Sequence, residues 1–264
     1  MFIVGGHTRL ILDWDAQRNV GNFLADFMAN GTVLFVFVAG YLFQALSHKY
    51  AYRRYISSKM KNVVLPYIIV SAPAVYLAID YYDPVAVYPV LEGTSVAYQV
   101  VWFYAKGGAH LNFPLWFIPM ISLYYLLAPL FMLFIRYPKL YWLLVPLAGI
   151  SLFIHRAPLP HLDTAQLALY FLSAYVAGMC VSQYRGAINS LLSGRLGWLV
   201  SVYVILLLAH FFLAPKHGVH AAESWFSTEQ GVFDWPFLQK MFLCFVLLEL
   251  SSKYEDFLYP RLKY

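Results

Sequence analysis

Long apolar stretches recur along the whole chain of 264 residues, and short polar linkers separate them. A helix that crosses the hydrocarbon core of a bilayer needs about 20 mainly apolar residues. Because the backbone finds no water there, a series of such stretches predicts an all-α, polytopic bundle of transmembrane helices. We expect seven near-complete spans, at residues 33–47, 63–79, 115–135, 140–154, 165–182, 196–214 and 236–252.

The composition agrees with lipid as the solvent of this chain. Hydrophobic residues make up 61% and charged residues 12%, against about 25% charged residues in an ordinary soluble domain. A soluble all-α protein is the alternative, but it does not need so many stretches of membrane length. We expect a single membrane domain over residues 1–264. Cys180 and Cys244 lie inside apolar stretches without metal or redox spacing, so we expect them to be small buried hydrophobes and expect no bound metal.

Positive charge gathers in every second linker, which predicts the topology. Cytoplasmic loops of membrane proteins carry an excess of Lys and Arg. If residues 48–62 are cytoplasmic, then 136–139, 183–195 and 253–264 share that side and bring its total to twelve of the 18 Lys and Arg residues. The twelve are Lys49, Arg53, Arg54, Lys59, Lys61, Arg136, Lys139, Arg185, Arg195, Lys253, Arg261 and Lys263.

Residues 48–62 form a basic loop that is denser than topology alone requires. Five of the fifteen residues in HKYAYRRYISSKMKN are Lys or Arg. Such a cluster binds anionic lipid headgroups, and it equally suits the phosphates of a soluble ligand. The sequence leaves both readings open. Because topology accounts for most of the net charge of +5, we expect no nucleic-acid partner.

Few ionisable residues interrupt the apolar regions, and such residues are functional candidates because they are costly at membrane depth. His7 follows Gly5 and Gly6 at the end of an apolar stretch, where a neutral imidazole suits a general base or a simple interfacial residue. HGVHAAE at 217–223 only superficially resembles a metal site. The remaining expectations are structural: an interfacial anchor at His155 and Arg156, a core histidine bonded to a neighbouring helix at His210, and a Glu249–Lys253 pair.

Four short motifs occur in an order that resembles the acyltransferase 3 family of membrane acyltransferases. They are FIVGGH at 2–7, LFVFVAGYLF at 34–43, YISSKMKNVVLPY at 55–67 and LWFIP at 115–119. The second motif matches the family pattern at Leu34, Phe35, Phe37, Gly40, Tyr41, Leu42 and Phe43. The resemblance covers residues 2–120, and beyond them it is mostly one of hydropathy.

The resemblance implies transfer of an acyl group, typically acetyl, from acyl-CoA to a hydroxyl of an envelope carbohydrate. It implies that His7 is catalytic and that Trp116 binds substrate. With the charge pattern, we expect Arg53, Arg54, Lys59 and Lys61 to bind the acyl-CoA donor, with no permanently bound cofactor. The implied location is the bacterial inner (plasma) membrane, with the basic loops cytoplasmic.

The chain also departs from the family pattern. The family carries an arginine ahead of the histidine, at a position that falls before Met1, and Arg-x-x-Arg where this chain has Lys59 and Asn62. We therefore expect truncation at both ends and low activity of the chain as written. A transporter or flippase without chemistry and a non-catalytic family member remain alternatives, although no inverted repeat of the transporter kind is visible.

Overall fold

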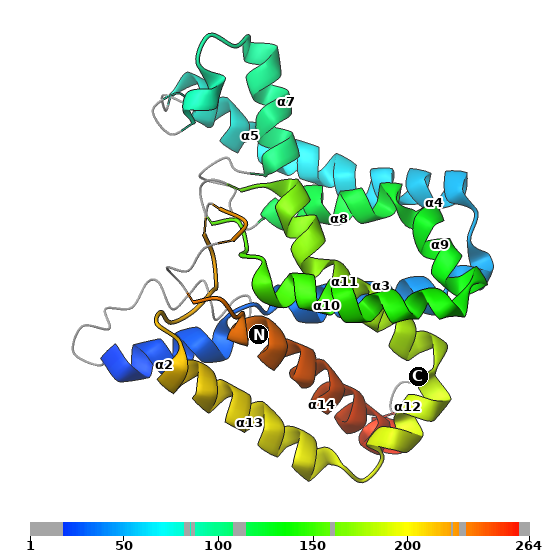
Figure 1. The fold of residues 1–264 in the computed structure, drawn as a ribbon. Helices are drawn as coiled ribbons and strands as arrows, with labels where there is room; N and C mark the ends of the chain where they lie inside the picture. Colours follow the sequence, from blue (N-terminus) through cyan, green and yellow to red (C-terminus); the bar gives the residue numbers. More distant parts are fainter. Residues whose placement is uncertain are drawn as a thin grey trace.

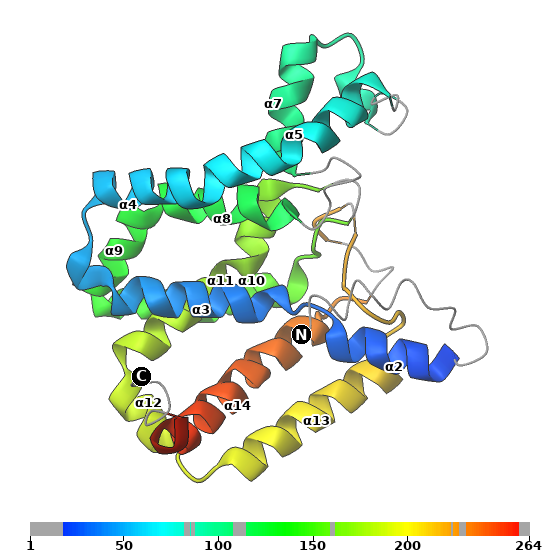
Figure 2. The same cartoon turned by 180° about the vertical axis from the view of Figure 1, so that it is seen from behind.

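The computed structural model describes residues 18–81, 85, 88–107, 115–158, 162–222, 224–226 and 231–258. The described chain is all-α, as predicted (Figures 1 and 2). The α-helices are α2 (Arg18–Met28), α3 (Thr32–Ala45), α4 (Tyr52–Lys59), α5 (Leu65–Asp80), α7 (Val96–Lys106), α8 (Phe117–Leu126), α9 (Ala128–Arg136), α10 (Leu144–Phe153), α11 (Thr164–Gln183), α12 (Arg185–Leu192), α13 (Leu196–Leu213) and α14 (Trp235–Leu258).

The centre of the bundle is the close crossing of α3 and α11. Gly40 on α3 lies against the backbone of α11, where an added Cβ would come within 2.0 Å of the Tyr175 carbonyl oxygen. Gly178 on α11 makes the reciprocal contact, since a Cβ added there would lie 2.0 Å from the Phe37 carbonyl oxygen. Small residues allow such approach between membrane helices, and van der Waals packing then holds them together. Gly40, which belongs to the family-like motif, is thus a packing residue.

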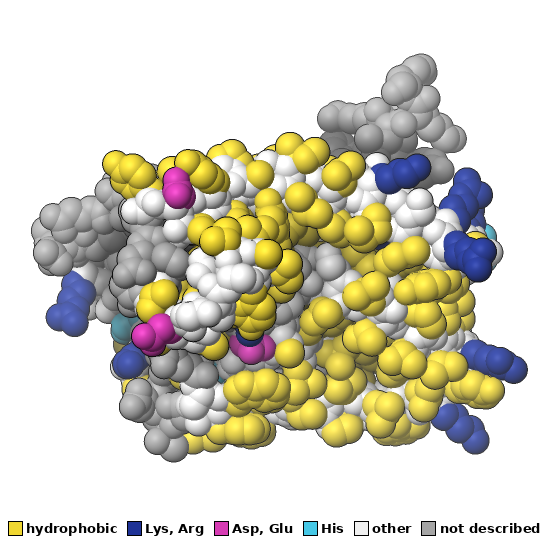
Figure 3. Space-filling view, turned by 90° about the horizontal axis from the view of Figure 1, so that it is seen from above, with side chains coloured by type: hydrophobic (Ala, Val, Ile, Leu, Met, Phe, Trp, Pro, Cys, Tyr) yellow, Lys and Arg dark blue, Asp and Glu magenta, His cyan; other side chains and the backbone are white. Residues whose placement is uncertain are grey.

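Successive long helices run back and forth between two ends of the bundle. The end where α3 and α11 finish and α4 begins carries the residues 48–62, and we call it the basic end. The end where α11 and α14 begin and α13 finishes is called the histidine end, after His155, His217 and His220 in its loops. In the space-filling view a hydrophobic face separates the ends, and Lys and Arg side chains cluster along one edge (Figure 3).

The number of full spans is smaller than predicted. By length and hydropathy, four described helical stretches are able to cross a membrane: residues 18–45 (α2 with α3), 52–80 (α4 with α5), 164–183 (α11) and 196–213 (α13). A fifth is the pair α8 and α9, which bends by 55° near Pro129 at the start of α9. The predicted span at 140–154 corresponds to a shorter apolar helix over 138–153. The described residues thus contain four to five candidate spans where seven were predicted, and the predicted stretch 236–252 is helical within α14 without being counted among them. The fold class is confirmed.

The basic loop is also more regular than predicted. Residues 52–62 are helical, and α4 continues into α5 through a π-helical turn at Met60–Val64. Pro66 does not break the helix, because it lies directly after this turn, where Leu65 donates its N–H to the Met60 carbonyl. A π turn shifts the bonding pattern of a helix locally. Beyond it, the end of α5 and α7 project from the bundle (Figure 1), joined by a cluster around Val75 and Phe103.

Candidate functional site

At the basic end, the four predicted donor-binding residues lie on one helical stretch but do not all face the same way. Arg53, Arg54 and Lys61 are exposed. Lys59 is half-buried, and its Nζ lies 5.5 Å from the ring centroid of Tyr55 and 5.1 Å from that of Tyr125. Successive helical residues are about 100° apart around the helix axis, so neighbouring basic residues point in different directions. Lys59 points toward the bundle, and the other three point outward. The structure thus separates Lys59 from the three outward-facing cations.

At the histidine end, Trp116 is buried just before α8, with 6% of its surface exposed. The Phe171 ring stacks against its indole at a centroid distance of 6.0 Å. The guanidinium carbon of Arg156 lies 4.3 Å from the centroid of the same indole. Gly107, at the left-handed C-terminus of α7, allows this packing, since a Cβ there would lie 2.7 Å from Trp116 Cα. Most of the indole is therefore already covered by protein, with the Arg156 cation held on its surface.

Asp234 joins three elements of the histidine end and is completely buried. Its Oδ1 accepts a 2.7 Å hydrogen bond from the Phe237 N–H and so caps α14. Its Oδ2 accepts a 2.6 Å bond from the Tyr170 hydroxyl of α11, and Tyr170 in turn accepts from the Asn30 amide. His220 approaches from the loop after α13, with Nδ1 3.6 Å from Asp234 Oδ2.

Two stacked histidines extend this network. The ring centroids of His155 and His220 are 4.1 Å apart, with 29° between the ring planes. His220 Nε2 lies 2.9 Å from the Gly231 carbonyl, which can only accept, so Nε2 carries the proton. Burial lowers the pKa of His155 below its ordinary value, and His220 lowers this pKa further. Because His155 is 1% exposed, the prediction of an interfacial anchor was wrong for it.

A second carboxylate, Asp26 of α2, forms a separate cluster and is also fully buried. Its Oδ2 lies 2.8 Å from His217 Nδ1, and its Oδ1 accepts a 2.7 Å bond from the Gly218 N–H. His210 Nε2 of α13 lies 3.4 Å from Oδ1. The prediction that His210 is a core histidine bonded to a neighbouring helix is confirmed, because its partner Asp26 lies on α2.

The two histidines of HGVHAAE therefore serve different carboxylates. His217 approaches Asp26, whereas His220 approaches Asp234. Across the described ranges there is no group of three or more His, Cys, Asp or Glu residues arranged to hold a metal ion. Cys244 is buried and Cys180 partly so, and both are free thiols.

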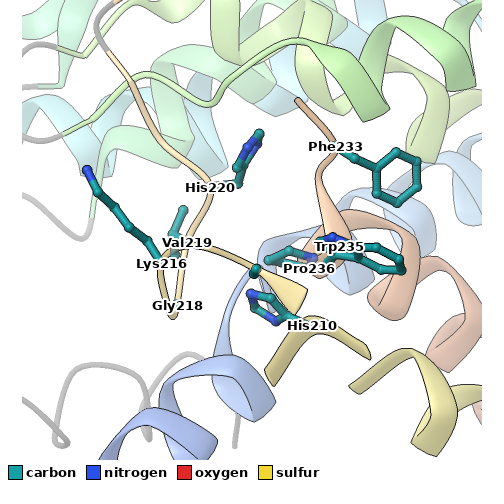
Figure 4. A pocket seen from close by; sticks show the side chains of 9 residues that line it. His210, Lys216, Gly218, Val219, His220, Phe233, Trp235 and Pro236 are labelled. Carbon is teal, nitrogen blue, oxygen red and sulfur yellow. The ribbon is translucent and has the colours of Figure 1, made fainter. Parts of the chain in front are cut away.

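A small recess opens between the two carboxylate clusters. About 220 Å³ of space, which includes open solvent, lies between its lining residues, and Figure 4 shows His210 and His220 on opposite sides of it. Val219, Trp235 and Pro236 supply apolar walls. The recess thus combines two imidazoles from different loops and helices with apolar walls.

Sequence reasoning missed several of these residues. Lys240 is completely buried on α14, with Nζ 2.9 Å from the Phe27 carbonyl and 3.3 Å from Gln239 Oε1. The sequence did contain a signal for Lys240, namely a lysine inside an apolar stretch. It also contained a signal for the helix cap at Asp234, namely an Asp directly before Trp-Pro. Glu249 accepts a 2.9 Å bond from the Gly194 N–H, so the predicted pairing with Lys253 was wrong. The donor lies in the loop before α13, 55 residues from Glu249 in sequence, and the sequence does not reveal this pairing.

His7, the predicted catalytic residue, lies outside the described residues.

Comparison with known proteins applies to the whole chain. No curated protein and no solved structure matches it. The model of the acyltransferase 3 family, described as an acyltransferase domain, matches residues 1–263. Because this match covers nearly the full length, and the described helices include four to five that are able to span a membrane, the chain belongs to the acyltransferase 3 family of membrane proteins.

Proposed function

We propose that this membrane acyltransferase moves an acetyl group from acetyl-CoA to a hydroxyl of an envelope carbohydrate. The observation that carries the proposal is the family match over residues 1–263, which makes acyl transfer the class of reaction. The acceptor and the acetyl donor are inferred from the resemblance of the Gly-Gly-His, GYLF and LWFIP motifs. The proposed location is the inner membrane of a bacterium.

The donor is expected to bind at the basic end. The phosphates of acetyl-CoA are polyanionic and stay in water, whereas the acetyl thioester sits at the far end of a long, uncharged arm. Arg53, Arg54 and Lys61 are exposed beside the half-buried Lys59, an arrangement that suits phosphates at the mouth of the bundle. The arm would then enter the bundle and bring the thioester to the acceptor.

The proposed chemistry assigns the base to His7. Its imidazole takes the proton from the acceptor hydroxyl, and the hydroxyl oxygen attacks the thioester carbonyl carbon. The new C–O ester bond forms as the C–S bond breaks. The CoA thiolate leaves and receives the proton from the imidazolium. No redox partner or metal ion is needed for this balance.

Neutralising the basic helix tests the donor site and, with it, the function. In the variant R53Q/R54Q/K59Q/K61Q of the full-length protein, we expect CoA affinity to fall and the Michaelis constant for acetyl-CoA to rise by at least 10-fold. Raised salt should produce part of the same loss with the parent protein, because exposed charges are screened. Calorimetry with CoA and transfer of labelled acetyl to envelope saccharide measure the two effects.

Two outcomes would count against these assignments. Unchanged CoA affinity in the fourfold variant would remove the basic helix from donor binding. Absence of labelled product with every acceptor fraction, although CoA binds, would contradict acetyl transfer. R136Q/K139Q is the control, because it removes two cations from the same end but from other elements, the last residue of α9 and the turn that follows it.

The orientation of the bundle has its own test. Ser57 on α4 and Ser95 at the start of α7 are both exposed. In intact cells, an impermeant thiol reagent should label a cysteine at position 95 and spare one at position 57 in a cysteine-free background. Permeabilised cells should show labelling at both. The reverse pattern in intact cells would invert the topology and place the basic end outside the cytoplasm.

A further inference from the structure

Arg156 is held at the histidine end by its backbone, which fixes where its side chain begins. Its N–H donates a 3.1 Å bond to the His220 carbonyl, and its own carbonyl accepts a 3.1 Å bond from the Ala222 N–H. This bridge ties the loop after α10 to the loop after α13. The side chain then lies over the Trp116 indole, 4.3 Å from its centroid. The guanidinium is thus held in place by two independent constraints.

Within the described residues, this guanidinium has no ion pair and no side-chain hydrogen bond. The nearest acidic influence comes from Asp234, whose oxygens already accept bonds from Phe237 and Tyr170. By contrast, Lys106 at the same end is ion-paired with Asp163 at 2.9 Å. Five guanidinium N–H donors are therefore left for water or for a ligand.

The surroundings of Arg156 favour a ligand. The side chain is half-buried, so part of it remains exposed at the surface. Burial lowers the pKa of Arg156, while Tyr170 and Asp234 raise it. Removing a cation from water is unfavourable unless an anion and hydrogen-bond acceptors replace the lost hydration. The planar fork of a guanidinium matches a carboxylate or phosphate, which accepts two parallel hydrogen bonds.

We propose that Arg156, supported on Trp116, binds an anionic oxygen group of the acceptor, so that the acceptor is an acidic saccharide. This identification of the occupant rests on the proposed function. The shared chemistry is an oxyanion, which is either a carboxylate on the sugar or a phosphate attached to it. In this arrangement Arg156 contacts the substrate, and Trp116 is the positioning residue beneath it.

Direct binding tests the site without turnover. The probes are an oligosaccharide of glucuronic acid, its carboxyl-reduced neutral form and a sugar 1-phosphate, each titrated into the full-length protein by calorimetry. We expect tighter binding of one charged probe than of the neutral form, and the charged probe that is preferred identifies the source of the oxyanion. Arg156→Gln should weaken binding of that probe by about 10- to 100-fold, the scale of a charge-assisted hydrogen bond, and leave the neutral form unchanged.

Matched variants separate the guanidinium from the positive charge and from packing. Arg156→Lys keeps the charge but lacks the fork, so it should restore only part of the affinity. Trp116→Phe keeps an aromatic surface under Arg156 and should retain most of the preference for the charged probe. Lys106→Gln removes a cation that already has a partner and should leave the preference intact. Equal weakening of charged and neutral probes by Arg156→Gln, or no preference in the parent protein, would overturn the proposal.

The same variants distinguish failure of this site from failure of the proposed function. If the protein binds the acidic saccharide through Arg156 but transfers no acetyl group, the anion site stands and the acetyltransferase proposal falls. If Arg156→Gln transfers acetyl like the parent protein, and the substitution changes the Michaelis constant of neither the charged nor the neutral acceptor, the function stands and the anion site falls.

Discussion

Replacing His7 with alanine is expected to lower acetyl transfer by about 10²- to 10⁴-fold, the usual contribution of a general base. The residue stands in the Gly-Gly-His motif that resembles the catalytic motif of the family to which the chain belongs. Without the imidazole, the acceptor hydroxyl keeps its proton and is a poor nucleophile toward the thioester. The measurement is transfer of labelled acetyl from acetyl-CoA to envelope saccharide by the full-length protein.

The control for His7 is His210→Ala. His210 is 2% exposed and faces the buried carboxylate of Asp26, so its removal should lower the melting temperature more than the turnover of the remaining folded protein. His7→Ala should instead melt like the parent protein and bind CoA with unchanged affinity. If His7→Ala transfers acetyl at the parental rate, His7 has no catalytic role and another histidine must be sought at the histidine end.

Adding a single methyl group at the crossing of α3 and α11 is expected to destabilise the bundle strongly. In Gly178→Ala, the new Cβ would lie 2.0 Å from the Phe37 carbonyl oxygen and 2.9 Å from the Tyr41 nitrogen. In Gly40→Ala, it would lie 2.0 Å from the Tyr175 carbonyl oxygen. The obstructing atoms belong to backbone, so no side chain is able to rotate away and the helices must separate. Overpacking commonly costs about 1–3 kcal/mol, and this rigid contact should reach or exceed the upper value.

Thermal unfolding and size-exclusion profiles in detergent measure this effect. Gly149→Ala and Gly197→Ala are the controls, because each lies in a helix with nothing within 4 Å of the added Cβ. Alanine favours a helix by about 1 kcal/mol over glycine, so these controls should fold at least as well as the parent protein. A Gly178→Ala protein that melts at the parental temperature would show that the helices do not approach as closely as described.

Arrangements that depend on neighbouring residues in the sequence could be predicted. The apolar stretches led to the all-α membrane bundle, because lipid requires each backbone group to be satisfied within its own helix. The separation of a basic end could also be read from the sequence, since short linkers must alternate between the two ends. The motif around Gly40 pointed to the family, although the sequence offered no view of the α11 backbone that makes this glycine necessary.

The boundaries of the spans were less predictable. Hydropathy identified residues 63–79 as a span but could not show that the basic stretch ahead of it is part of the same helix, 52–80. It also could not show the 55° bend between α8 and α9. A helix continues through polar and apolar residues alike, because its hydrogen bonds join backbone groups. The change from a polar to an apolar stretch therefore does not show where a helix begins.

The candidate site at the histidine end was decided by tertiary structure. Asp26 and His217 are 191 residues apart in sequence, and Tyr170 and Asp234 are 64 apart, yet each pair is in hydrogen-bond contact. Their meeting depends on how α2, α11, α13 and α14 pack, which no periodic pattern encodes. The sequence by itself determined that the chain lies in lipid, that it is helical and that basic residues gather at one end of the bundle, because these properties follow from local composition. Only tertiary packing decided which buried charges meet and left Arg156 on Trp116, because such contacts join loops that are distant in sequence.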